Sequence, residues 1–385
     1  MKVAVVAEFY PRAADPVLGV WAHRQAVAAR DAGADVRVIV LHRPLPPLAA
    51  AKAGPKAAVR ATARALAQPR RAALDGIDIS YVPFLAPPRP GSYGAWGRWA
   101  APSLSFALRA LRKRFPYDLV HAHSAVPAGE AVRRAGLPTP YVVSVHGGDV
   151  FHTAPGSAGG AEAVRAAFAR SRLVLANSAA IEHACRVLGA PATRVVHLGS
   201  DLPQRREPPY PEPTVVTTGH VIARKRHRDV LAAIAQQPGL RYLVIGDGPE
   251  LDALKQLAAT LGVADRVEFA GQLHHEEALR RTRRAHVFAM PSTDEAFGVA
   301  YVEAMAGWLP AIGARGEPGP EEIAACGDGM TTVPAGDSGA LATAIDALIG
   351  DAAQAQRARR TVEQHFSWDA CGAATVAAYE AALAR

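Results

Sequence analysis

The sequence predicts an α/β protein with two doubly wound, Rossmann-like domains. Short apolar runs alternate with stretches of helical periodicity in both halves of the chain. Such alternation is typical of βαβ units, which build a parallel sheet with helices on both faces. A segment with five prolines, residues 201–213, separates the halves, and 385 residues are enough for two domains of ordinary size.

The apolar runs give the expected strands in order. In the first half they are residues 3–7, 36–41, 77–85, 119–123, 141–145 and 173–176, with a helix over 20–32. In the second half they are residues 214–218, 240–245, 267–270, 286–290 and 309–312. We therefore predict a first domain over 1–202, a linker over 203–213, a second domain over 214–365 and a terminal helix over 366–385.

Composition and charge indicate which partners and which cell compartment to expect. The net charge of +8 favours anionic partners such as nucleoside diphosphates. The basic helix at 280–284 lacks interleaved aromatic residues, so nucleic acid is not expected as a partner. Cys185, Cys326 and Cys371 are widely spaced, which is typical of free thiols in a reducing compartment. No apolar run has the length of a membrane span, and the start of the chain resembles a strand rather than a signal peptide. We predict a cytoplasmic protein.

The most informative stretch is a predicted strand-to-helix turn that contains Glu295. A helix follows, with Phe297, Gly298 and Val299 expected as its first turn. Exposed backbone N–H groups at a helix start form an anion site, and Gly298 has no Cβ to keep a phosphate away. Glu303 lies about one turn further along. Two carboxylates therefore flank a predicted phosphate site, and they suit sugar or ribose hydroxyls better than phosphate.

The spacing Glu295-x7-Glu303, with Phe297-Gly298 after the first glutamate, resembles the signature of the retaining GT-B glycosyltransferases of the large family four. The resemblance covers essentially the whole chain. It implies a GT-B architecture: two Rossmann-like domains, a cleft between them, and a last helix that crosses back to the first domain. It also implies that Glu295 binds hydroxyls of the transferred sugar, that Glu303 binds the ribose, and that Phe297, Gly298 and Val299 contact the donor.

Two segments of the first half fit the same family. Residues 146–149 (His-Gly-Gly-Asp) resemble the H-G-x-D motif, which places His146 beside the transferred sugar. The alternative is a turn histidine before a flexible glycine pair. Gly19 corresponds in position to the glycine loop near the donor diphosphate, although the usual double glycine is single here. His121 and His123 match the D-x-V-H-x-H pattern, and we expect a buried structural role for them.

A third segment follows the first strand of the second half. Gly219, His220, Arg224 and Lys225 resemble the G-R-L-x-x-x-K loop, whose Arg and Lys hold the donor diphosphate. Lys225 is in register, but His220 stands at the arginine position, so Arg224 is the candidate that replaces the missing guanidinium. A solvated basic turn is the alternative. Gly246 begins a turn similar to the family's G-x-G-P turn.

The resemblance implies retaining transfer of a sugar from a nucleoside-diphosphate sugar to an acceptor hydroxyl. Lys225, Arg224, His146 and Glu295 are the predicted catalytic residues, since a leaving diphosphate needs charge neutralisation. The expected acceptor is a glycan or a lipid-linked molecule, in cell-surface glycan, glycolipid or polysaccharide biosynthesis. No Asp-x-Asp motif lies at the predicted cleft, so we expect neither a metal nor a cofactor. Two alternatives stay open: a GT-B sugar-nucleotide 2-epimerase, and a nucleotide-sugar-binding protein impaired in catalysis by His220.

Two surface segments interrupt the alternation. Residues 44–72, rich in alanine, proline and basic residues, are expected to form a mobile or amphipathic excursion. A Gly/Pro-rich loop within 87–100 and the basic helix after it predict peripheral contact with the inner face of the cell membrane. The residues expected in that contact are Tyr93, Trp96, Trp99, Arg109, Arg112, Lys113 and Arg114. A loop whose rings pack on their own domain is the alternative.

Overall fold

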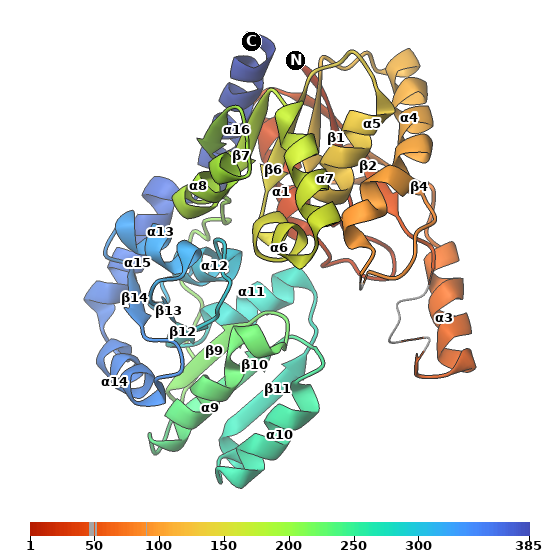
Figure 1. Cartoon of the computed structure of the whole chain (residues 1–385). Helices are drawn as coiled ribbons and strands as arrows, with labels where there is room; N and C mark the ends of the chain where they lie inside the picture. The colour runs from red at the N-terminus through yellow and green to blue at the C-terminus, as the bar shows by residue number, and fades with distance from the viewer. Residues whose placement is uncertain (46–49, 51, 90) are drawn as a thin grey trace. The chain divides into compact units, whose positions relative to one another are not determined.

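The structure is a computed structural model that describes residues 1–45, 50, 52–89 and 91–385. The chain forms two compact units. The first contains Met1–His197 together with Cys371–Arg385, and the second contains Leu198–Ala370. Each unit has one sheet of mainly parallel strands with helices beside it (Figure 1). The predicted two-domain α/β fold is confirmed.

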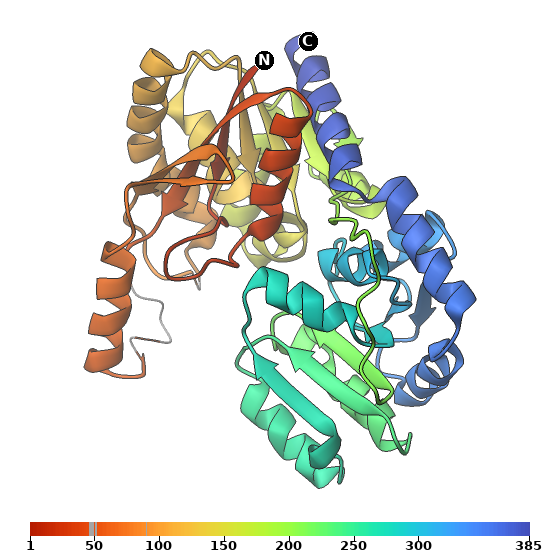
Figure 2. The same ribbon diagram turned by 180° about the vertical axis from the view of Figure 1, so that it is seen from behind.

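The first unit follows the predicted alternation closely. Its strands are β1 (Lys2–Ala7), β2 (Asp35–His42), β3 (Arg71–Leu74), β4 (Ile77–Pro83), β5 (Leu119–His123), β6 (Tyr141–Val145), β7 (Leu173–Ala176) and β8 (Thr193–Val195). Its helices are α1 (Val20–Asp31), α3 (Pro55–Leu66), α4 (Trp96–Arg114), α5 (Glu130–Ala135), α6 (Ala154–Gly156), α7 (Ala158–Ala169), α8 (Ala179–Val187) and most of α16 (Trp368–Leu383). Helices α5 and α7 cover the face of the sheet seen in Figure 1, and α1 and α16 cover the face seen in Figure 2.

The strand order in this sheet is β3-β4-β2-β1-β5-β6-β7-β8. All neighbours are parallel except β3, which is antiparallel to β4. The chain builds outward from β1 through β2 and β4, and then starts again on the other side with β5. The switch point of the topology therefore lies between β1 and β5, where Ala7 and His123 are paired in register.

The second unit has the strands β9 (Thr214–Thr218), β10 (Arg241–Ile245), β11 (Val267–Gly271), β12 (Val287–Ala289), β13 (Ala311–Ala314) and β14 (Met330–Val333). Its helices are α9 (His227–Ala235), α10 (Leu251–Thr260), α11 (His275–Arg283), α12 (Val299–Ala306), α13 (Pro318–Ala325), α14 (Ser338–Leu348) and α15 (Ala352–His365). The strand order is β11-β10-β9-β12-β13-β14, with every pair parallel, so this sheet has its switch point between β9 and β12. Side chains of α9, α10 and α14 form a buried core with one face of the sheet.

The proline-rich segment expected as a linker, residues 203–213, carries no helix or strand. It packs on the second unit. The Tyr210 amide donates to the Arg284 carbonyl at 2.8 Å, and the Arg284 guanidinium lies 4.5 Å from the centre of the Tyr210 ring.

The C-terminal helix α16 packs against the first unit, as the resemblance implies. The Gln25 amide donates to the Thr375 hydroxyl at 3.1 Å, and His121 Nδ1 lies 2.7 Å from the Tyr379 hydroxyl. A Cβ at Gly372 would overlap the backbone of Ala28, so close approach of α16 to α1 requires a glycine there. None of the described helices has the length and hydropathy that a membrane span needs.

The expected excursion at 44–72 is partly regular. It contains α3 and the first two residues of the short edge strand β3, while residues 46–49 and 51 lie outside the described part of the chain. Strand β3 was not predicted because its four residues are all exposed and lack apolar alternation. Strands β8 and β14 were also missed.

The loop predicted to meet a membrane packs instead on its own unit, and the prediction for Trp96 is wrong. Trp96 is 4% exposed, and its ring centre lies 5.6 Å from that of Phe84 and 5.1 Å from that of Tyr93. The Tyr93 hydroxyl donates to Glu8 Oε2 at 2.7 Å. Burial of the rings and a partner for the hydroxyl outweigh the exposed position that a Gly/Pro-rich loop predicts. Pro90 of this loop lies outside the described residues.

Candidate active site

The switch point of the second sheet brings two predicted segments together. The loop after β9 contains Arg224 and Lys225, and the loop after β12 contains Glu295. Because β9 and β12 are neighbours, the loops at their carboxyl ends meet although 70 residues separate Lys225 from Glu295. Ligands of open α/β sheets bind at such crevices.

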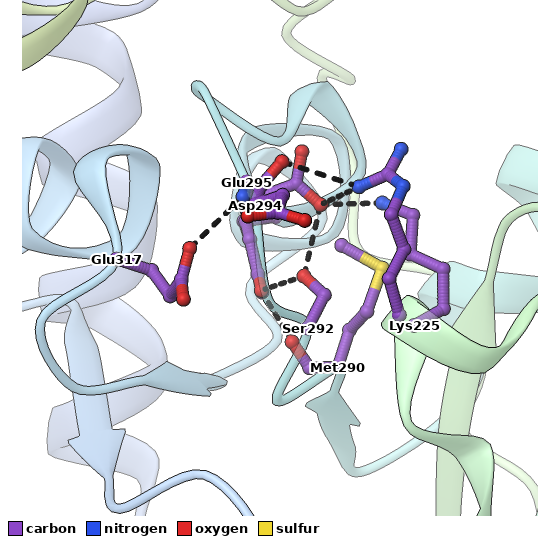
Figure 3. Close-up of polar contacts among 8 residues, drawn as sticks. Lys225, Met290, Ser292, Asp294, Glu295 and Glu317 are labelled. Atoms are coloured by element: carbon purple, nitrogen blue, oxygen red, sulfur yellow. Dashed lines mark hydrogen bonds and ion pairs between the residues drawn. The ribbon is translucent and has the colours of Figure 1, made fainter. Parts of the chain in front are cut away.

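Glu295 is the centre of a charged cluster (Figure 3). The Lys225 ammonium forms an ion pair with Glu295 Oε2, and Arg224 Nη1 lies 3.8 Å from the same oxygen. The Ser292 hydroxyl also donates to this oxygen at 2.9 Å. Burial alone would raise the pKa of Glu295, but the Lys225 charge and these hydrogen bonds hold it below its usual value. Glu295 is therefore an ionised acceptor at neutral pH.

A residue that sequence reasoning did not select fixes the backbone of Glu295. Glu317 Oε2 accepts a hydrogen bond of 3.0 Å from the Glu295 amide, and the Gly319 amide donates to the Glu295 carbonyl at 2.8 Å. Figure 3 shows Glu317 reaching Glu295 from the side opposite Lys225. Glu317 precedes Pro318 at the start of α13, and this Glu-Pro pair was the available signal for an ordered turn.

The helix after Glu295 starts two residues later than expected. It is α12, and Gly298 is its N-cap residue at φ 83°, so Phe297 and Gly298 lie outside the helix. Phe297 is buried, with its ring centre 5.5 Å from that of Phe366. Its side chain therefore belongs to the core, and any contact of Phe297 with a donor is left to its backbone. Val299 is the first helical residue and presents one of the unpaired N–H groups.

Gly298 is required by its surroundings. A Cβ at this position would overlap the ring of Tyr301, which is fully buried. The Tyr301 hydroxyl donates to the Met290 carbonyl and lies 3.2 Å from Ser292 Oγ, so the ring is held from the loop side as well. Tyr301 thus ties the start of α12 to the end of β12.

Gly219 and Gly246 follow the neighbouring strands β9 and β10, and their backbones pack against each other. A Cβ at Gly246, whose φ is 142°, would overlap the Gly219 carbonyl. The Gly219 amide donates to the Ile245 carbonyl at 2.9 Å. His220 follows with an exposed side chain. The structure thus brings Arg224 and Lys225 to the carboxylate cluster, whereas it leaves the His220 ring in solvent.

Glu303 lies on α12, one turn beyond its start. His275 Nε2 is 3.7 Å from Glu303 Oε1, and the Glu303 side chain is largely buried. The Glu303 carboxylate thus lies one turn from the backbone N–H groups at the start of α12.

In the first unit, the predicted histidines lie together at the carboxyl ends of β5 and β6. His123 Nδ1 is 3.1 Å from His146 Nε2, and the two rings are stacked. His121 Nε2 is 2.7 Å from the Ser144 hydroxyl. Burial lowers the pKa of His146 to about 4 and that of His123 well below its usual value, so both rings are neutral at pH 7.

Asp149, the last residue of the His-Gly-Gly-Asp segment, holds a neighbouring loop. Its carboxylate accepts hydrogen bonds from the amides of Ala125 and Val126 at 2.8 and 3.0 Å. Burial raises its pKa to about 6, although these amides oppose the rise. Gly19 is the N-cap of α1, packed against the backbone of Phe9. Among the described residues, no group of three or more His, Cys, Asp or Glu is arranged to hold a metal ion.

The comparisons with known families agree with this geometry. Residues 18–204 match the family described as Glycosyltransferase Family 4, and residues 201–365 match the family described as Glycosyl transferases group 1. The chain belongs to the GT-B glycosyltransferases of family four. The two matched regions together extend from the first helix to the end of α15.

Relatives of this GT-B chain include glycosyltransferases named for lipopolysaccharide core and teichuronic acid biosynthesis. The lipopolysaccharide core biosynthesis glycosyltransferase LpsE of Rhizobium meliloti is 32% identical over 166 residues, which cover 42% of this chain and 48% of LpsE. The putative teichuronic acid biosynthesis glycosyltransferase TuaC of Bacillus subtilis is 26% identical over 333 residues, covering 81% of this chain and 80% of TuaC. The chain thus spans about half the length of LpsE and most of TuaC.

Solved structures of similar fold cover the GT-B chain almost completely. Sucrose-phosphate synthase from Thermosynechococcus elongatus superposes with a TM-score of 0.79 at 21% identity, covering 100% of this chain and 99% of the other. The Anabaena protein Alr3699/HepE, solved in complex with UDP, gives a TM-score of 0.72 at 20% identity, covering 99% and 100%. At these identities the likeness concerns the fold.

The buried histidines make stability depend on pH. Burial, with a smaller contribution from the neighbouring His146, lowers the pKa of His121 to about 3. Since the folded-state pKa lies below the usual 6.5, the stabilisation is complete above pH 6.5 and is lost as the pH falls toward 3. Between pH 7 and about pH 5 this group should cost about 2 kcal/mol of unfolding free energy. His121→Gln should flatten the fall of thermal stability with pH, whereas His183→Gln, at an exposed position, should leave it unchanged. An identical pH profile for His121→Gln and wild type would contradict the assignment.

Proposed function

We propose that the protein is a retaining glycosyltransferase that moves a sugar from a nucleoside-diphosphate sugar to an acceptor hydroxyl. The observation that carries this proposal is the pairing of Lys225 with Glu295 at the switch point of the second sheet. Lys225 and Arg224 both approach one carboxylate oxygen, so two cations face one anion beside the helix start at Gly298. Such a site attracts a diphosphate.

The roles of the residues follow from this placement. Lys225, Arg224 and the N–H groups at the start of α12 neutralise the leaving diphosphate, which favours transfer without a divalent metal. Glu295, ionised and held by Ser292 and Glu317, accepts hydrogen bonds from hydroxyls of the transferred sugar. Glu303 binds the ribose. His146, neutral at pH 7, positions the sugar, because an imidazole offers one donor and one acceptor.

The reaction is proposed as a front-face displacement. A bond forms between the acceptor oxygen and the anomeric carbon, and the bond between that carbon and the phosphate oxygen breaks on the same face. The acceptor proton passes to the leaving diphosphate. The complexes of HepE with UDP and UDP-glucose support a nucleotide-sugar donor, and the names of LpsE and TuaC support an acceptor in polysaccharide or lipid-linked glycan synthesis.

Donor turnover tests the proposal. Nucleotide sugars are first screened by thermal shift, and those that stabilise the protein are then tested for release of nucleoside diphosphate. The anomer of the product is read by proton NMR. Release of diphosphate with retained configuration supports the proposal. An altered nucleotide sugar without release would indicate an epimerase, and stabilisation without turnover would indicate a binding protein.

Replacement of Glu303 tests the ribose role. Glu303→Ala removes a charged acceptor, and hydrogen bonds to charged groups contribute about 1.5–3 kcal/mol. We therefore expect free nucleoside diphosphate to bind the variant about 10- to 100-fold more weakly by calorimetry. Glu277→Ala, a change of the same kind on the surface of α11, is the matched control. Equal affinity of Glu303→Ala and wild type would show that Glu303 does not bind the ribose.

A further inference from the structure

The positive charge of the chain is concentrated in one segment. Between Asp35 and Asp75 the sequence contains no acidic residue. The eight basic residues of that segment are Arg37, Arg43, Lys52, Lys56, Arg60, Arg64, Arg70 and Arg71. Their charge equals the net charge of +8 of the whole chain, so the remaining residues are neutral in sum. Such a run of like charge creates a positive electrostatic potential around the segment.

Helix α3 lies within this segment, and its residues are exposed or half-buried. No residue of α3, all of which the structure describes, is buried. In both views it stands apart from the helices that cover the sheet of its unit (Figures 1 and 2). Two contacts hold its end: His42 Nε2 lies 2.9 Å from the Ala65 carbonyl, and the Ala13 amide donates to Gln68 at 2.9 Å. The helix is thus anchored to the unit while its outer face is open.

The outer face of α3 is amphipathic. Lys56, Arg60 and Arg64 follow one another at intervals of four residues and form one stripe, since four residues are about one helical turn. None of them has an ion pair within the described part of the chain. Val59 and Leu66, seven residues apart, form an adjoining aliphatic stripe, and each is 68% exposed.

We propose that α3 binds the surface of an anionic lipid bilayer. The basic stripe attracts acidic headgroups, and Val59 and Leu66 enter the boundary between headgroups and acyl chains. The aliphatic stripe decides between lipid and a soluble polyanion, because a polyanion offers these side chains no apolar layer. This surface differs from the aromatic loop that the sequence suggested, whose Trp96 is buried.

Vesicle cosedimentation with the full chain tests the proposal. At about 0.01 M salt the protein should bind vesicles of equal parts phosphatidylglycerol and phosphatidylcholine but not pure phosphatidylcholine, and about 0.5 M salt should release it. Each basic residue near such a surface contributes about fivefold to binding. Arg60→Glu with Arg64→Glu should therefore lower the partition coefficient by at least about 25-fold. Val59→Ser with Leu66→Ser should lower it by at least about tenfold.

The control changes the same charge elsewhere in the unit. Arg165→Glu with Arg170→Glu, two exposed cations on α7 and at its C-cap, should change binding by less than about threefold because distant charges are screened. Unchanged melting temperatures show that the α3 variants are folded. If both charge-reversal variants lose vesicle binding equally, the net charge of the protein explains the binding and the proposal for α3 is overturned. Full binding by the serine variant, together with equal affinity for soluble polyphosphate, would overturn it in favour of a polyanion.

Discussion

Lys225→Ala should lower kcat by about 10²- to 10³-fold, as the loss of one preorganised donor to a developing anion does in other enzymes. The side chain is 12% exposed and pairs with Glu295, which would keep its charge without its main partner. Removing one partner of a buried ion pair lowers the free energy of unfolding. Because the Lys225 charge is lost, the pKa of Glu295 should also rise. The measurement is kcat for release of nucleoside diphosphate, with the melting temperature taken in parallel.

Three further variants make this result interpretable. Arg228→Ala, an exposed cation on α9, should keep kcat within about twofold, because exposed charges act weakly. Arg224→Ala should approach the loss of Lys225→Ala, since Arg224 lies 3.8 Å from the same carboxylate oxygen, whereas His220→Ala should be mild. If Lys225→Ala turns over the donor like wild type, the diphosphate is held elsewhere and the proposed site is wrong.

Gly298→Ala should cost about 3–5 kcal/mol of unfolding free energy and abolish donor binding. The alanine would have to adopt a backbone φ of 83°, and its Cβ would overlap the Tyr301 ring. Strain of a left-handed residue contributes about 1–3 kcal/mol, and overpacking adds about as much. Tyr301 cannot move aside without losing its hydrogen bond to the Met290 carbonyl. Urea unfolding and calorimetry with nucleoside diphosphate measure the two losses.

The chain offers a matched control for this change. Gly239 has a φ of 87°, but a Cβ there would meet nothing within 4 Å. Gly239→Ala should therefore cost only the backbone strain, about 1–3 kcal/mol, and leave donor binding unchanged. If the two variants lose equal stability, contact with Tyr301 is not what requires a glycine at 298.

The strands were the part of the fold that the sequence predicted best. Strands β5, β6, β7 and β9 have the predicted bounds. Their residues are almost all buried, as expected for parallel strands covered on both faces, and such strands appear in a sequence as continuous apolar runs. Strand β3 gave no such signal because the edge of a sheet buries none of its side chains.

Surface segments were predicted less well. The rings of Tyr93 and Trp96 are compatible both with a membrane interface and with a packed loop. The neighbouring sequence does not distinguish these two interpretations. The partners that decide it, Glu8 and Phe84, come from other parts of the chain. Helix α3 shows the converse case: a surface excursion was expected over 44–72, but the bounds of the helix and its exposed aliphatic residues came only from the structure.

By itself, the sequence determined which residue types follow which strand: a lysine after β9, a glutamate after β12, and histidines at the ends of β5 and β6. These depend on local patterns of apolar runs, glycines and helix starts. The tertiary structure alone decided which of them meet. Lys225 reaches Glu295 across 70 residues, and Tyr379 reaches His121 across 258. Strand order brings such pairs together, and it is set by the packing of whole sheets and helices rather than by any neighbouring stretch of sequence.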